Sequence, residues 1–197
     1  MAVKVSTAYF PADYPALMTI RRVAVIGAGT MGSGIAQVCA QTGWETRLFD
    51  AFPDSLENGM EKINEFWDKG ISIGKTSPQQ KEVWSANLRA TSEMSDAVED
   101  SDIVIEAVPE RMELKRSIFN ELEGLAPSSA ILATNTSGLP ISEIASHTGC
   151  PERVIGMHFF NPVPLMQLLE IVRHELVDES TVSTAKEVGE AMGKTTI

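Results

Sequence analysis

Residues 20–50 read IRRVAVIGAGTMGSGIAQVCAQTGWETRLFD, and this stretch contains the features that decide the fold. An apolar run leads into the glycine-rich turn GAGTMG at 27–32, and the segment after it has the pattern of a helix that stops at Gly43. A second apolar run ends at Asp50. The order of strand, glycine turn, helix and strand predicts the first unit of a parallel sheet wrapped by helices.

Each glycine of this turn has a separate physical role. Gly27 permits the tight turn, Gly29 lets the backbone approach a diphosphate, and Gly32 lets the helix pack closely on the strand. Free amide groups at the helix N-terminus carry partial positive charge, so an acidic protein can still bind an anion there. The residues that we expect to line a dinucleotide at this turn are Gly27, Ala28, Gly29, Thr30, Met31 and Gly32.

The acidic residue at the end of the second strand favours NAD over NADP. Asp50 follows Gly27 by 23 residues, near the usual spacing of about 20 for the carboxylate that accepts hydrogen bonds from the ribose hydroxyls. A 2′-phosphate about 4 Å from that carboxylate would cost about 4 kcal/mol per pair of unit charges at an effective dielectric near 20. Residues 51–53 supply no arginine to offset the repulsion. Two alternatives stay open: FAD binds the same kind of turn, and Asp50 could merely cap the next helix.

The alternation of strands and helices continues along the chain. Further strands are expected at 102–108, 130–136, 154–160 and 168–172, and residues 194–197 resemble the start of another. Helices are expected at 30–41, 53–69, 112–125, 141–146 and 181–192, with one more starting at the pair Ser77 and Pro78. The predicted fold class is α/β: a Rossmann-like, doubly wound and mainly parallel sheet with helices on both faces. We assign residues 20–197 to this NAD-binding domain and residues 1–19 to an N-terminal extension.

Composition excludes several classes of partner and setting. The chain has 197 residues with 16 basic and 27 acidic side chains, and the net charge of −11 disfavours binding to nucleic acid or to an anionic membrane. Its two cysteines, Cys39 and Cys150, stand far apart, which fits a reducing compartment and argues against a thiolate zinc site. No apolar run approaches the roughly 20 residues that span a bilayer. We therefore expect a cytoplasmic protein.

Among the three histidines, His158 is the candidate general base. It lies near the end of the strand VIGMHFF, and open parallel sheets bind ligands at the carboxyl ends of their strands. Histidine is also the side chain best suited to remove a hydroxyl proton at neutral pH. His147 and His174 stand among polar residues and are expected at the surface. The alternative for His158 is a core histidine without a catalytic role.

Two further side chains belong to the same hypothesis. Glu170 interrupts the apolar run LMQLLEIV, where a carboxylate is costly unless it is paired. The imidazolium of His158 would be a natural partner, and the pairing would fix the histidine tautomer. The alternative is an edge strand that exposes Glu170 to water. Ser137 follows the strand AILATNT, so its hydroxyl could contact a substrate oxygen or the nicotinamide, although a simple Ser-Gly turn is the better explanation from the spacing alone.

Other reaction classes lack their sequence signatures. The chain contains no GxSxG nucleophile elbow, no HExxH metal-binding pair and no P-loop. Hydrolase, metalloprotease and kinase functions are therefore disfavoured, and no metal site is expected.

Four segments in a fixed order carry a resemblance to a known family. They are GAGTMGSGIAQ at 27–37, VIEAVPE at 104–110, TNTSGLPI at 134–141 and HFFNPVPLMQLLEIV at 158–172. Together they closely resemble the L-3-hydroxyacyl-CoA dehydrogenases, including the 3-hydroxybutyryl-CoA dehydrogenases. The likeness extends from about residue 20 to residue 197.

The resemblance implies oxidation of an L-3-hydroxyacyl-CoA to the 3-ketoacyl-CoA with NAD as acceptor, and the reverse reaction. His158 matches the general base of the family, Glu170 the carboxylate that orients it, and Ser137 the hydroxyl that contacts the reacting oxygen. The residues that match the cofactor-lining positions of the family are Glu110, Lys115 and Asn161.

The resemblance also implies an acyl-CoA substrate and a homodimer. In the family a helical domain follows the cofactor domain and supplies dimer contacts and a substrate-positioning asparagine. That domain would begin beyond residue 197, so we expect this chain alone to have weak dehydrogenase activity or none. Gln167 stands where many relatives have lysine. The lysine-bearing segment 59–81 corresponds roughly to the CoA-contacting region, although a solvated helix face would look the same.

Two other functions stay open on these residues. One is a dehydrogenase of a free 3-hydroxy acid rather than of a thioester. The other is an NAD-binding module without catalytic activity.

Overall fold

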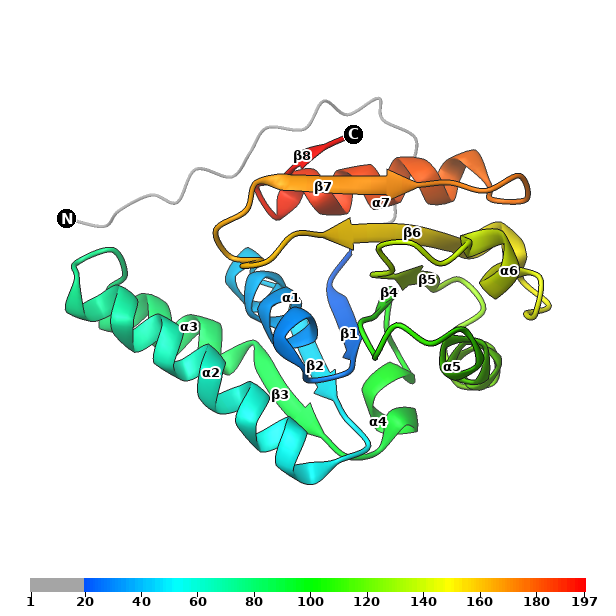
Figure 1. Ribbon diagram of the computed structural model, residues 1–197. Coiled ribbons are helices and arrows are strands. Elements are labelled where there is room, and N and C mark those ends of the chain that lie inside the picture. The colour runs from blue at the N-terminus through cyan, green and yellow to red at the C-terminus, as the bar shows by residue number, and fades with distance from the viewer. Residues whose placement is uncertain (1–19) are drawn as a thin grey trace.

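The structure is a computed structural model that describes residues 20–197. The protein is built around a single sheet (Figure 1). Its strands are β1 Arg22–Ile26, β2 Glu45–Phe49, β3 Leu88–Thr91, β4 Ile103–Glu106, β5 Ile131–Thr134, β6 Val154–Phe159, β7 Leu168–Val172 and β8 Thr195–Thr196. They lie in the order β3-β2-β1-β4-β5-β6-β7-β8. Neighbours are parallel from β3 to β6, β7 is antiparallel to β6, and β8 is parallel to β7. The predicted doubly wound, mainly parallel sheet is confirmed.

Helices cover both faces of this sheet. They are α1 Thr30–Thr42, α2 Pro53–Ser72, α3 Pro78–Ala86, α4 Met94–Val98, α5 Met112–Leu125, α6 Ile141–Ala145 and α7 Glu179–Ala191, with a short 3-10 helix at Pro151–Arg153. Buried side chains of α1, α2 and α7 form one core cluster with the sheet, and those of α4, α5 and α6 form the other. Figure 1 shows α1 and α2 on one side of the strands and α5 and α6 on the other.

Local sequence explains where the helices begin and end. Gly43 ends α1 in the left-handed conformation that glycine adopts at low cost, with φ of 97°. Ser77 caps α3, because its hydroxyl oxygen accepts a hydrogen bond from the backbone amide of Gln80. In turn, the side-chain oxygen of Gln80 accepts a hydrogen bond from the backbone amide of Ser77. In α2, Ile63 and Trp67 are buried, one turn apart on the same face of the helix. These boundaries agree with the sequence-based predictions to within a few residues.

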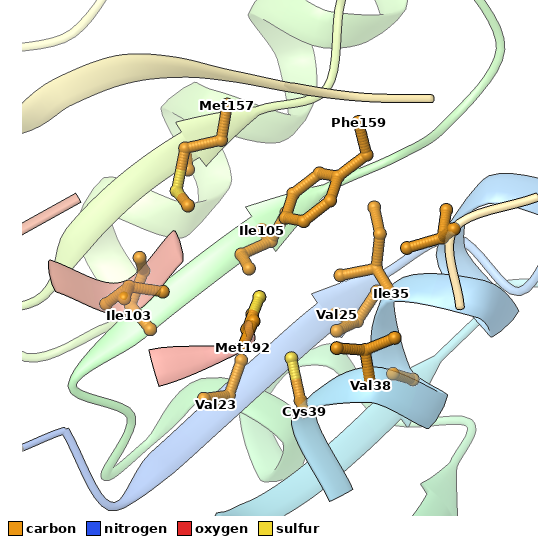
Figure 2. Close-up of a cluster of buried hydrophobic side chains, with 14 of the residues drawn as sticks. Val23, Val25, Ile35, Val38, Cys39, Ile103, Ile105, Met157, Phe159 and Met192 are labelled. Carbon is orange, nitrogen blue, oxygen red and sulfur yellow. The ribbon is translucent and has the colours of Figure 1, made fainter. Parts of the chain in front are cut away.

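The core beneath α1 joins strands that are distant in sequence. Figure 2 shows Val23 and Val25 of β1 in the same cluster as Ile103 and Ile105 of β4. Side chains of β6 and of α1 complete the cluster, among them the fully buried Phe159. Packing of this kind makes the carboxyl ends of β1, β4, β5 and β6 a rigid platform, because close-packed interiors deform little.

The sequence-based description missed two elements. Strand β3 and helix α4 are short, and only one residue of β3 is buried, so their apolar pattern is weak. The expected surface position of His174 is also wrong, because this residue is half-buried and its Nε2 donates to the carbonyl of Val154 at 3.0 Å. The predicted N-terminal extension, residues 1–19, lies outside the described residues. Within residues 20–197, no helix is long and apolar enough to cross a membrane.

Candidate active site

The glycine turn between β1 and α1 has the shape that a dinucleotide requires. Gly27 has φ of +103°, a backbone conformation that L side chains rarely adopt. A Cβ atom on Gly32 would lie 1.7 Å from the carbonyl oxygen of Gly27, so α1 packs against the turn only because this residue has no side chain. Gly29, by contrast, would meet nothing within 4 Å among the described residues. The turn is therefore tight inside and open outside, where a diphosphate would approach.

The start of α1 is available to an anion. Gly29 is the N-cap, and no side chain in the described part of the chain caps the helix. No acidic side chain lies in the first turn. The amide groups and the positive end of the helix dipole at Thr30 and Met31 therefore face no carboxylate of their own helix.

Two backbone amides hold the carboxylate of Asp50 in place. One carboxylate oxygen accepts the amide of Ala28 at 2.7 Å, and the other accepts the amide of Phe52 at 2.9 Å. These two bonds fix the carboxylate between the glycine turn and the start of α2, and each oxygen retains a lone pair for a further donor. A residue that only capped α2 would not need the hydrogen bond to Ala28, so the cap alternative does not explain the position of Asp50.

His158 and Glu170 face each other across an antiparallel strand pair. The register of β6 and β7 pairs these two residues directly, and His158 Nδ1 lies 2.6 Å from Glu170 Oε2. Because the carboxylate is an acceptor, Nδ1 carries the proton and Nε2 is left as the basic nitrogen. The side chain of His158 is 19% exposed and that of Glu170 is 39% exposed, so the pair is reachable from solvent. The ring of Phe160 packs at 4.6 Å from the imidazole centroid.

Ser137 lies at the same edge of the sheet, in the turn after β5, which neighbours β6. Glu110 organises this turn: its Oε1 accepts the Thr136 hydroxyl at 2.5 Å, the Ser137 amide at 3.0 Å and the Ser137 hydroxyl at 3.4 Å. Burial pushes the pKa of Glu110 upward, but hydrogen bonds from Thr136 and the turn amides outweigh it and hold the pKa below its usual value. Glu110 is therefore a carboxylate at neutral pH that fixes the serine turn.

A buried ion pair supports Glu110, and one of its members escaped the sequence analysis. Lys115 and Glu106 are both fully buried, and the Lys115 ammonium lies 2.7 Å and 2.8 Å from the two oxygens of Glu106. The same ammonium lies 3.5 Å from Glu110 Oε2. Thr134 completes the group with a hydroxyl bond of 2.7 Å to Glu106. Lys115 thus contacts both the buried carboxylate of Glu106 and the partly exposed carboxylate of Glu110.

Asn161 lies just beyond β6, on a segment that is held from two sides. The buried ammonium of Lys194 donates to the carbonyls of Val163 at 2.5 Å and of Met166 at 2.8 Å. Burial lowers the pKa of Lys194. On the other side, Gly34 of α1 packs so closely that an added Cβ would lie 3.0 Å from Val163. Asn161 itself is exposed, at the mouth of the site.

A cavity of about 140 Å³ adjoins this segment, between α1 and α2. Asn161 and Pro164 line it from the segment, Gln37 from α1, and Lys62 and Phe66 from α2. Gln37 is 3% exposed, and its Nε2 has no hydrogen-bond partner within residues 20–197. A buried amide of this kind calls for a polar ligand or a bound water. No sequence pattern marks Gln37, because its burial depends on how α2 packs.

Comparison with known proteins decides the family. A family model described as "3-hydroxyacyl-CoA dehydrogenase, NAD binding domain" matches residues 22–197. The chain belongs to this family. The match agrees with the resemblance carried by the four sequence motifs, and it makes NAD the cofactor of the domain.

Individual relatives of the domain are similar over nearly all of the chain. A probable 3-hydroxybutyryl-CoA dehydrogenase of Bacillus subtilis is 42% identical over 181 residues, covering 91% of this chain and 62% of that protein. The 3-hydroxybutyryl-CoA dehydrogenase of Bradyrhizobium diazoefficiens is 40% identical, with 89% and 59% covered. The crystal structure of (S)-3-hydroxybutyryl-CoA dehydrogenase from Ralstonia eutropha superimposes with a TM-score of 0.88 at 35% identity, covering 91% and 63%. The chain therefore spans about three-fifths of the length of these relatives.

The residues of this 3-hydroxyacyl-CoA dehydrogenase domain fit NAD. The uncapped start of α1, the open space above Gly29 and the fixed carboxylate of Asp50 match the diphosphate and the adenosine ribose. Ser137 and the pair of His158 and Glu170 lie along the same edge of the sheet, where the nicotinamide end would extend.

Replacing Asp50 with alanine should shift the cofactor preference of the domain. The variant loses the acceptor of the ribose hydroxyls, so Kd for NAD should rise about tenfold or more, since 1.4 kcal/mol corresponds to a factor of ten. Kd for NADP should fall, because the carboxylate no longer repels the 2′-phosphate. Titration of the chain with both cofactors measures the ratio. The exposed Asp54, in the first turn of α2, is the control; a D54A variant with an equal shift would contradict the role of Asp50.

Proposed function

We propose that the full-length protein is an NAD-dependent L-3-hydroxyacyl-CoA dehydrogenase that interconverts the 3-hydroxyacyl and 3-ketoacyl thioesters. The observation that carries the proposal is the 2.6 Å contact between His158 and Glu170, at the carboxyl end of β6, on the sheet edge that also holds the glycine turn. The similarity to named 3-hydroxybutyryl-CoA dehydrogenases supports the substrate class.

His158 is the proton acceptor in this reaction. Its Nε2 takes the proton of the C3 hydroxyl as the C3–H bond breaks and the carbon–oxygen double bond forms. NAD, when bound, supplies the acceptor for the hydride that leaves C3. The Glu170 carboxylate holds the Nδ1 proton and stabilises the imidazolium that results. In the reverse direction the imidazolium returns the proton to the carbonyl oxygen.

Other residues orient the reactants. Ser137 hydrogen-bonds the reacting oxygen, in a turn that Glu110 fixes through four hydrogen bonds. Asn161 contacts the nicotinamide end of the cofactor. We assign Lys115 an indirect role, because its buried ammonium reaches Glu106 and Glu110. The cavity at Gln37 and Lys62 would receive part of the thioester arm, whose amide carbonyls suit an unpartnered amide donor.

The proposal extends to the setting and assembly of the protein. We infer a cytoplasmic homodimer whose subunits associate through a helical domain like that of the family, without nucleic-acid or membrane partners. Sedimentation of the full-length protein tests this assembly, and a monomer at micromolar concentration would contradict it.

A substrate comparison tests the function. The full-length protein is incubated with NAD and L-3-hydroxybutyryl-CoA, its D-isomer or free L-3-hydroxybutyrate, and NADH formation is followed. The proposal predicts saturable oxidation of the L-thioester alone. Preferred oxidation of the free acid would establish the second candidate, a hydroxy-acid dehydrogenase. Tight NAD binding without oxidation of any of the three would point to an NAD-binding module.

A further inference from the structure

The strand that carries His158 extends beyond its partner on one side. Strands β5 and β6 pair from Leu132 with Val154 to Thr134 with Gly156, and the ladder ends there. His158 lies two residues further along β6. On its other side, β6 is paired with β7 as far as Phe159. His158 and Glu170 therefore belong to a hairpin, and the part of β6 that carries His158 makes no backbone pairing with β5.

Within residues 20–197, one side-chain hydrogen bond crosses this gap. Asn135, the first residue after β5, accepts the amide of Phe159 through its side-chain Oδ1 at 2.8 Å. Its own backbone amide donates to the carbonyl of Glu106, at the end of β4, at 2.8 Å. Because an amide N–H needs an acceptor, this bond also fixes which end of the Asn135 carboxamide faces β6.

The two bonds of Asn135 connect the halves of the site. From the glycine turn, the connection runs through the bond between the Ala107 amide and the Ile26 carbonyl to β4, then through Asn135 to Phe159. His158 precedes Phe159 directly. The Asn135 carboxamide is therefore one of the links that set the distance between the cofactor turn and the proton acceptor, at the point where the ladder between β5 and β6 has ended.

We propose that Asn135 is a positioning residue that sets the place of the His158 imidazole relative to the bound cofactor. The inference rests on the proposed function, since it assigns the histidine the proton transfer. Loss of the bond leaves the fold of both hairpin strands intact, because β6 keeps its pairing with β7. It loosens the carboxyl end of β6 next to His158, and a displacement of about 1 Å at a reacting group can cost about 100-fold in rate.

Two variants and a matched control test the assignment in the full-length protein. Asn135→Ala removes the acceptor, and Asn135→Asp retains an oxygen in the same position. Asn87→Ala removes a carboxamide that is also half-buried and also bonds to the backbone, through the carbonyl of Ala40. Asn87 precedes β3, at the opposite end of the strands.

The first readout separates rate from binding. We expect N135A to lower kcat between 10-fold and 100-fold (about the range expected for a misplaced reacting group), with Kd for NAD nearly unchanged. The deuterium isotope effect of the C3-labelled substrate should rise, because hydride transfer becomes limiting. N135D should recover most of kcat, and N87A should behave as the wild type. A kcat for N135A within twofold of the wild type, or an equal loss in N87A, would overturn the assignment.

The second readout needs no turnover. Hydrogen exchange at the Phe159 amide should be slow in the wild type and in N135D, and about tenfold faster or more in N135A. If the wild type oxidises no 3-hydroxyacyl-CoA, the proposed function is wrong. In that case, hydrogen exchange at the Phe159 amide alone tests whether Asn135 holds β6 in place. Unchanged exchange at Phe159 in N135A would overturn the inference by itself.

Discussion

His158→Gln should abolish nearly all turnover while leaving the cofactor in place. A positioned general base contributes about 100-fold to 10,000-fold to a rate, and glutamine cannot accept the hydroxyl proton. Its side chain can still donate to Glu170, so the hairpin should stay folded. We expect kcat of the full-length enzyme to fall by that factor, with Kd for NAD changed less than about threefold, as measured by NADH formation and by cofactor titration.

The matched control is His147→Gln. His147 is exposed and bonds through Nδ1 to the backbone of its own short helix, at the carbonyl of Glu143. The control should retain full activity. Comparable loss in both variants would indicate a general effect of removing histidine, and full activity in H158Q would exclude His158 as the proton acceptor.

Gly32→Ala should weaken both cofactor binding and the fold. The new Cβ would sit 1.7 Å from the Gly27 carbonyl oxygen, so α1 or the turn must move. Overpacking of this severity costs about 3 kcal/mol of unfolding free energy or more. Displaced amides at the start of α1 should raise Kd for NAD by about 100-fold, the equivalent of two charge-assisted hydrogen bonds. Urea unfolding and NAD titration of the chain measure both effects.

Gly124→Ala is the control for this substitution. Gly124 is exposed in α5, and a Cβ there would meet nothing within 4 Å in the described part of the chain. Alanine in a helix should raise the unfolding free energy by up to about 1 kcal/mol and leave NAD binding unchanged. If the free energy of unfolding falls in G32A and rises in G124A, the loss in G32A is due to the contact of the new Cβ with Gly27. Unaltered NAD affinity in G32A would contradict the geometry of the turn.

The sequence allowed prediction of those parts of the fold whose causes are local. Periodic apolar residues and the glycine turn identified β1, α1 and β2, and Gly43 and Ser77 marked helix ends that the structure confirms. His158 and Glu170 were proposed as partners because a carboxylate in an apolar strand needs one, and their register in β6 and β7 provides it. The short β3 and α4 lacked a pattern strong enough to detect.

The remainder of the site depends on packing that no local pattern encodes. Glu106 stands in the apolar strand β4, and its role becomes visible only when α5 brings Lys115 against it. The burial of Gln37 depends on where α2 lies. Asn135 acquires its function from the point at which the pairing of β5 with β6 ends.

A crystal structure of the full-length protein with NADH and a 3-ketoacyl-CoA would show where the reacting atoms lie. We expect His158 Nε2 within about 3.2 Å of the C3 oxygen, the range for a general acid or base in place. The Nδ1 bond to Glu170 should persist, with the nicotinamide against the opposite side of C3. A thioester whose C3 oxygen lies away from His158, with Nε2 bonded to another protein group, would contradict this expectation.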